Sequence, residues 1–134
     1  MPEKRNSPLF PKQKWNELPS PDPDSQTSIL NAVALVRFYD QSSDWQWYGI
    51  EFDQADVFWG IVTNGKLALA GNFSLSELEG IESEETRRKT VRIDEDFKPL
   101  KVSELAQSDL AVMEMMRDLE SRMRSIPSDL VELD

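Results

Sequence analysis

The middle of the chain alternates between apolar and polar positions, which predicts a β-sheet. Residues 32–39 (AVALVRFY) form a short β-branched and aromatic run that is typical of a mostly buried strand. In residues 45–53 every second side chain should lie on the same face of a strand. The face predicted to be core carries Tyr48, Ile50 and Phe52, and the opposite face carries Trp45, Trp47, Gly49, Glu51 and Asp53. We therefore expect one apolar face and one face that combines aromatic and acidic groups.

Two further strands, 57–63 and 66–70, are separated by Asn64-Gly65, the strongest hairpin signal in the sequence. Both central positions of a type I′ turn need a positive φ, which this dipeptide tolerates. A fifth strand is expected at 90–93, after a charged connection at 82–89. The pattern predicts an antiparallel meander of four or five strands.

Helices are predicted on the C-terminal side of the meander. A capping box at residues 74–77 indicates a short helix. A C-terminal helical segment, 102–126, should begin with Ser103 or Ser108 as its cap. Its apolar stripe, with steps of four and three residues, consists of Val112, Met116, Leu119, Met123 and Ile126. We therefore predict an α+β fold, in which a four- to five-stranded antiparallel meander sheet carries one short helix and a longer C-terminal helix packed on it.

The N-terminal region differs in composition from the rest of the chain. Six of the eight prolines fall in the first 23 residues, and proline cannot take part in strand ladders or helix interiors. Residues 1–28 are therefore interpreted as a Pro-rich arm outside the core, preceding a single α+β domain at 29–134. Within the arm, a helical turn at 12–18 should dock on the domain, and 19–28 should form a mobile loop.

The composition limits the catalytic, metal-binding and disulfide chemistry that the chain can carry. The 134 residues include no histidine and no cysteine, which excludes Ser-His-Asp and Cys-His catalysis, Cys/His zinc sites, iron–sulfur clusters and disulfides. We expect no cofactor and no metal. No apolar run approaches the length of about 18 residues that a membrane span needs, so we expect a cytoplasmic protein without a membrane partner.

The charge is uneven along the chain. The chain has 25 acidic and 15 basic residues, giving a formal net charge of -10, and the excess lies in residues 33–81 and 102–134. Residues 1–32 and 82–101 are neutral. A field of this sign disfavours nonspecific binding to nucleic acid and to anionic lipid.

Five segments in the same order resemble a small bacterial family, the DUF2958 domain of unknown function. They are LFPK (9–12), VRFYDQSSDWQWYGIEFD (36–53), FWGIV (58–62), GNFSLSELE (71–79) and DEDFKPLKVSEL (94–105). The residues that match the family's W-Y-x-x-E-F-D strand are Trp47, Tyr48, Glu51, Phe52 and Asp53. The chain departs from the family at Trp59, usually Phe, and at Asn72, usually Tyr. The resemblance implies a fold and a link to plasmids and other mobile elements, but no activity.

The most suggestive cluster joins Glu51 and Asp53, with Asp56 nearby and Trp45 and Trp47 on the same predicted face. Carboxylates at i and i+2 of a strand lie about 6.5 to 7 Å apart. They could share a magnesium ion, act as an acid–base pair, or contact a partner. The alternative is a solvated face whose acids pair with Lys and Arg, with Asp53 and Asp56 acting as turn residues.

Two other groups are candidates for binding. The only basic concentration consists of Arg87, Arg88, Lys89 and Arg92, and it is flanked by acidic residues that cancel its field. The helical methionines Met113 and Met115 suit an adaptable contact surface, whereas Met116 and Met123 are expected to pack on the sheet.

These features favour a non-enzymatic binding or regulatory protein that contacts another protein, as a monomer or a homodimer. A specific version is an acidic decoy that occupies the basic, DNA-binding surface of its partner. One alternative is a metal-dependent hydrolase or transferase that uses Glu51 and Asp53. Another is nucleic-acid binding through residues 87–92.

The decoy hypothesis predicts an association that weakens as salt is added, because exposed charges are screened. Affinity for a basic partner, measured by calorimetry between low salt and about 0.5 M salt, should fall steeply. An affinity that does not change over this range would contradict the hypothesis.

Overall fold

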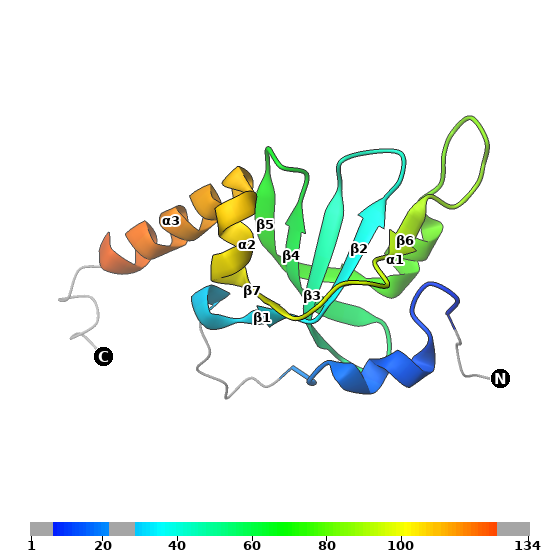
Figure 1. The fold of residues 1–134 in the computed structure, drawn as a ribbon, viewed down its shortest axis with the longest axis horizontal. Helices are drawn as coiled ribbons and strands as arrows, with labels where there is room; N and C mark the ends of the chain where they lie inside the picture. Colours follow the sequence, from blue (N-terminus) through cyan, green and yellow to red (C-terminus); the bar gives the residue numbers. More distant parts are fainter. Residues whose placement is uncertain (1–6, 22–28, 126–134) are drawn as a thin grey trace.

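A five-stranded antiparallel sheet organises the computed structural model, which describes residues 7–21 and 29–125 (Figure 1). The strands are β2 (Val36–Asp40), β3 (Gln46–Phe52), β4 (Val57–Thr63), β5 (Ala68–Ser74) and β6 (Val91–Ile93). They lie in the order β5-β4-β3-β2-β6, so β2 to β5 form the meander and β6 pairs with the free side of β2. The predicted α+β class and the antiparallel meander are confirmed.

A second, two-stranded sheet pairs β1 (Val33–Ala34) with β7 (Leu100–Lys101), and the sequence pattern did not predict it. The predicted strand at 32–39 is divided between β1 and β2, because the Leu35 N–H turns to donate to the Gly49 carbonyl at 2.8 Å. Strands of two residues are too short to show an alternation.

The hairpin at Asn64-Gly65 is confirmed, but its turn type differs from the prediction. The Asn64 N–H donates to the Leu67 carbonyl at 3.0 Å, so Gly65 and Lys66 are the two central residues. Gly65 has a φ of 88°, whereas Asn64 is not among the residues with positive φ. Glycine in the first central position is typical of a type II′ turn rather than type I′.

Within the described residues, five helical elements accompany the sheets: η1 (Lys12–Glu17), η2 (Ile29–Asn31), α1 (Leu75–Gly80), α2 (Val102–Ser108) and α3 (Leu110–Ser125). The capping box of α1 is confirmed. The Glu77 N–H donates to the Ser74 hydroxyl, and the Ser74 N–H donates to the Glu77 carboxylate, each at 3.0 Å.

The prediction of one C-terminal helix capped by serine is wrong. Lys101 is the residue before α2, and the helix is interrupted at Asp109. One Asp109 carboxylate oxygen accepts the Val112 N–H at 3.1 Å, and the other accepts the Thr63 hydroxyl at 2.9 Å. This aspartate therefore starts α3 and fastens it to β4. Ile126 and Pro127 lie outside the described residues.

A β-bulge in β3 overturns the predicted alternation. Gly49 lies opposite Gly60, but Glu51 lies opposite Trp59, so Ile50 is an extra residue. Directly opposed residues share a face, and one extra residue inverts the faces that follow it. Phe52 consequently joins Trp47 in one core cluster, while Tyr48 and Ile50 belong to the other.

The first core cluster, here called the aromatic core, is built largely from five phenylalanines. The Phe10 ring lies 5.8, 5.4 and 5.3 Å from the rings of Phe38, Phe52 and Phe58. The Phe58 ring stacks on Phe73 at 5.1 Å. Rings at such separations attract one another, and this attraction adds to the stabilisation that comes from burying their apolar area.

The N-terminal segment belongs to this core, so its interpretation as an arm outside the core is wrong. The predicted docking of the turn at 12–18 is confirmed, since Phe10, Trp15 and Leu18 are all buried. The Trp15 indole donates to the Phe10 carbonyl at 3.0 Å, and the Pro19 carbonyl accepts the Phe52 N–H at 2.9 Å. Proline lacks a donor but keeps this acceptor. Residues 22–28 lie outside the described residues.

The second core cluster, here called the helix-side core, lies between the other face of the sheet and α2 with the first turns of α3. Val102, Leu105 and Val112 pack there with Tyr48 and Ile61. Beyond this point α3 extends past β5, away from the rest of the sheet (Figure 1). No helix in the described ranges is both long enough and apolar enough to cross a membrane.

The bulge requires glycine opposite it. A Cβ at Gly60 would lie 1.8 Å from the Tyr48 carbonyl oxygen, which is backbone and cannot move aside. We expect Gly60→Ala to lower the free energy of unfolding in urea by more than about 3 kcal/mol, or to prevent folding. Gly80→Ala is the control, because no atom lies within 4 Å of its added Cβ. It should change stability by less than about 1 kcal/mol. Equal stabilities of the two variants would contradict the account.

Candidate functional site: a groove along β6

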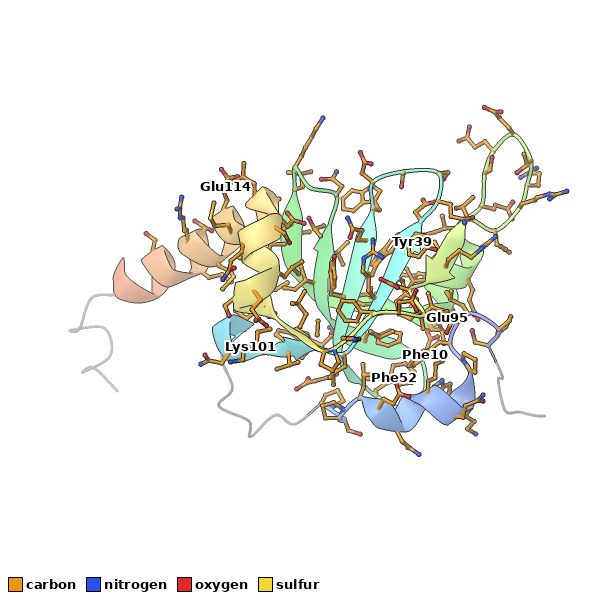
Figure 2. The ribbon with its side chains drawn as sticks, in the orientation of Figure 1. Phe10, Tyr39, Phe52, Glu95, Lys101 and Glu114 are labelled. Carbon is orange, nitrogen blue, oxygen red and sulfur yellow. The ribbon has the colours of Figure 1, made fainter. Side chains whose placement is uncertain are left out.

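A groove of about 660 Å³ lies beside β6, the last strand of the sheet. We call it the β6 groove. Its lining comes from the N-terminal segment, β2, α1 and β6 with the residues around it: Pro8, Leu9, Tyr39, Gln41, Leu78, Glu79, Lys89, Val91, Arg92, Ile93 and Glu95. Figure 2 shows Tyr39 and Glu95 on the β6 side of the molecule, far from Glu114 on α3. The volume is typical of binding pockets in proteins.

Ser7 fixes one wall of the groove. Its buried hydroxyl donates to the Glu79 carboxylate of α1 and accepts the N–H groups of Leu9 and Phe10, each at 3.1 Å. These bonds fold the start of the N-terminal segment against α1. Leu9 is thereby held beside Leu78, and both side chains face the groove.

A polar network holds the opposite wall. The Arg37 guanidinium donates to Asp94 and to Gln46, each at 3.0 Å, and it lies 5.0 Å from the centre of the Tyr39 ring. The Tyr48 hydroxyl donates to the same Gln46 oxygen at 2.8 Å. Arg37 therefore anchors both the Tyr39 ring and the chain that leaves β6 at Asp94.

Tyr48 is the neutral end of this network. Burial raises the pKa of its hydroxyl, and the negative charges of Asp109 and Asp94 act in the same direction, whereas Arg37 lowers the pKa. The shift is upward overall, so the phenol keeps its proton at neutral pH. Tyr48 serves here as a hydrogen-bond donor inside the sheet and not as a base.

The main chain of β6 presents donors to the groove. Arg92 lies opposite Tyr39, and the neighbouring pairs at 90 and 94 bond to β2 through the Thr90 carbonyl and the Asp94 N–H. Pairing alternates along an antiparallel ladder, so the N–H groups of Val91 and Ile93 point away from β2. The Arg92 guanidinium covers part of this edge, because it donates to the Lys89 and Val91 carbonyls at 3.0 Å each.

The structure brings two of the four predicted basic residues to the groove. Lys89 and Arg92 line it, whereas Arg87 and Arg88 lie on the exposed loop before β6. Lys89 and Arg87 lie 3.5 and 3.4 Å from Glu82. Such exposed pairs contribute little stability.

The predicted acidic face does not form one site. Trp47 is only 8% exposed and lies in the aromatic core, while the bulge turns Glu51 to the helix side opposite Trp59. The expectation that Trp47 and Glu51 share a face is therefore wrong. The part of the chain that the structure describes holds no group of three or more acidic residues arranged to bind a metal ion.

Asp53 and Asp56 shape the turn between β3 and β4. One Asp53 oxygen accepts the N–H groups of Ala55, Asp56 and Val57 at 2.9, 2.8 and 3.0 Å. Asp56 accepts the N–H and the hydroxyl of Ser76 at 3.0 and 2.7 Å. Both carboxylates thus hold backbone at the start of β4 and α1.

The remaining candidates are half-buried. Met113 and Met115 pack against the helix-side core, and Trp45 packs against the aromatic core. The candidate residues of the acidic face, the basic patch and the methionine group therefore lie in separate parts of the molecule.

The apolar walls of the groove, Leu9, Leu78 and Ile93, were not predicted from the sequence, and neither was Tyr39. The one signal in the sequence that pointed to the groove was the apolar pair Leu9-Phe10 within a proline-rich segment. Such a pair indicates docking but not the surface on which the segment docks.

Comparisons of the chain with protein-family models, curated proteins and solved structures give no match. The resemblance to the DUF2958 family stays a prediction, and the groove is interpreted from its own residues.

The Asp53 turn makes stability depend on pH. Partial burial raises the pKa of Asp53, but its three backbone donors outweigh this and bring it below the ordinary value of 3.8. The ionised carboxylate therefore stabilises the fold above that value, and the contribution is lost as the pH falls through the lowered pKa. Asp53→Asn keeps an acceptor but does not titrate. The stability advantage of the wild type over this variant, measured by urea unfolding, should shrink between about pH 6 and pH 3. An advantage that is constant over this range would contradict the assignment.

Proposed function

We propose that the protein is a non-catalytic binding protein that holds an extended segment of a partner protein in the β6 groove. The observation that carries the proposal is the combination of apolar walls with two outward-facing backbone N–H groups, at Val91 and Ile93, in one groove. An extended segment placed along an edge strand gains main-chain hydrogen bonds, and side-chain pockets then give specificity.

The walls favour an apolar residue in the bound segment. Leu9, Leu78 and Ile93 come from three different parts of the chain and face the same space. Burying one leucine-sized side chain there would contribute about 1.5 to 3 kcal/mol. The proposed ligand therefore places a leucine- or isoleucine-like side chain between these walls.

The rim favours a carboxylate next to that residue. Glu79 is engaged by the Ser7 hydroxyl, and Glu95 lies 3.5 Å from Lys14. Arg92, in contrast, has only backbone carbonyls as partners among the described residues. A carboxylate of the ligand would bind the Arg92 guanidinium in place of these carbonyls. The edge of β6 would then be free to bond to the incoming strand.

Two other hypotheses depend on features outside the β6 groove. The acidic-decoy hypothesis stays a prediction supported by the net charge, and the link to mobile elements stays a prediction supported by the family resemblance. The residues of the β6 groove support a partner segment that is itself apolar and acidic.

The test is selection of peptides from a random display library on the immobilised protein. The selected peptides should share an apolar residue flanked by Asp or Glu. Their affinity, measured by fluorescence anisotropy, should fall at least about tenfold on Arg92→Glu, the loss of one charge-assisted hydrogen bond.

Arg88→Glu is the matched control, because it makes the same change of charge on the exposed loop outside the groove. It should leave the peptide affinity within about twofold of the wild type. Equal effects of the two variants would show that binding depends on the overall field, and peptides without the predicted pattern would contradict the proposed ligand.

A further inference from the structure

The opposite edge of the sheet is a long strand with no charged residue. β5 spans Ala68–Ser74 and, in the part of the chain that the structure describes, no strand pairs with it on the side away from β4. Residues 67–73 carry no charge and no proline, and Leu67 and Leu69 are 65% and 70% exposed. An exposed, apolar edge strand is a template for pairing with another strand.

The two edge strands of the sheet, β5 and β6, differ in length and in the charges around them. β6 has three residues, is followed by Asp94, Glu95 and Asp96, and carries Arg92 over its carbonyls. Short length and nearby charges limit indiscriminate pairing of an edge strand, so β6 suits one specific segment rather than a second acidic copy of this chain. β5 has seven residues and none of these features within residues 67–73.

The hydrogen-bond pattern identifies which β5 residues are available. The Asn64 N–H donates to the Leu67 carbonyl, and the Leu75 N–H donates to the Asp56 carbonyl. Because pairing alternates along the ladder between them, the backbone of Leu69, Gly71 and Phe73 bonds to β4. The backbone groups of Ala68, Ala70 and Asn72 therefore point outward.

We infer that the β5 edge pairs with the β5 edge of a second copy of this chain, antiparallel and about a twofold axis at Ala70. In this register Ala70 lies opposite Ala70 of the second copy, and Ala68 lies opposite Asn72. The outward-pointing backbone N–H and C=O groups of all three residues then form hydrogen bonds between the two copies. The two sheets join into one continuous sheet.

Side-chain size supports this register. It places Leu69 of each copy directly opposite Gly71 of the other, on the same face of the joined sheet. No atom lies within 4 Å of the position that a Cβ on Gly71 would occupy, so there is room for the leucine. The largest exposed side chain of β5 thus meets its smallest residue, twice over by symmetry.

Charge also supports a second copy at this place. Two chains with a net charge of -10 repel one another, and the repulsion is weakest where the contact surface is uncharged. At the ends of the pairing, Lys66 of one copy lies opposite Ser74 of the other, next to the α1 turn that carries Glu77. Lys66, the one basic residue between positions 38 and 86 of the sequence, therefore meets the acidic end of its counterpart.

The position of α3 agrees with this assembly. The helix extends past β5 (Figure 1). Leu110, at its start, is 60% exposed. A twofold axis perpendicular to the sheet leaves α3 of both copies on the same side of the joined sheet. Each helix would then lie on the face of the joined sheet that carries the helix-side core, against which Met113 and Met116 pack.

Single-cysteine variants test both the partner and the register, since the chain has no cysteine of its own. Opposed residues in a bonded pair have Cα atoms about 5.5 Å apart, within disulfide range. Ala70→Cys should therefore form a disulfide-linked dimer under mild oxidation on a non-reducing gel. Asn72→Cys is the matched control, because its counterpart lies about 13 Å away along the strand. Equal crosslinking of the two variants would overturn the register.

Analytical ultracentrifugation of the full chain tests the interaction without crosslinking. The wild type and Thr86→Lys should sediment as dimers, and Leu69→Lys should sediment as a folded monomer with unchanged circular dichroism. Both substitutions add one positive charge, but Thr86 lies on the exposed loop at the far edge. A monomeric wild type at about 100 μM, well above the Kd of a specific dimer, would overturn the inference. A dimer that survives Leu69→Lys would do so as well.

Discussion

The close approach of β3 and β4 at Gly49 and Gly60 is the constraint on which the rest of the structure depends. There the Tyr48 carbonyl occupies the space that a side chain at Gly60 would need, and Ile50 is inserted as an extra residue. The insertion brings Phe52 to the face that already holds Trp47 and leaves Tyr48 and Ile50 on the other face. A single strand thereby supplies both cores, and each face needs a cover.

The two covers come from opposite ends of the chain. The N-terminal segment covers the aromatic core with Phe10, Trp15 and Leu18, and α2 with the start of α3 covers the helix-side core. Because Phe10 is buried among the rings of β2, β3 and β4, Leu9 is held at the rim of the same layer. The β6 groove is therefore a consequence of how the aromatic core is closed.

Local signals predicted the parts of the fold that depend on neighbouring residues. The capping box at Ser74 and the hairpin at Gly65 each need only a few adjacent residues, and both are present. The bulge at Ile50 could not be predicted, because Tyr48, Ile50 and Phe52 alternate without interruption in the sequence. The Asp109 break depends on a bond to Thr63, which is 46 residues away. For the same reason the sequence indicated Lys89 and Arg92 but not the walls contributed by Leu9 and Leu78.

The proposed binding requires that the backbone of β6 is open to a partner strand. Amide hydrogen exchange, resolved by residue with NMR, tests this most directly, on the free protein and with a peptide selected for binding. We expect the Val91 and Ile93 amides to exchange rapidly in the free protein and to become protected when the peptide is bound, while amides paired between β3 and β4 stay unchanged. Protection that arises elsewhere, with Val91 and Ile93 unaffected, would contradict it.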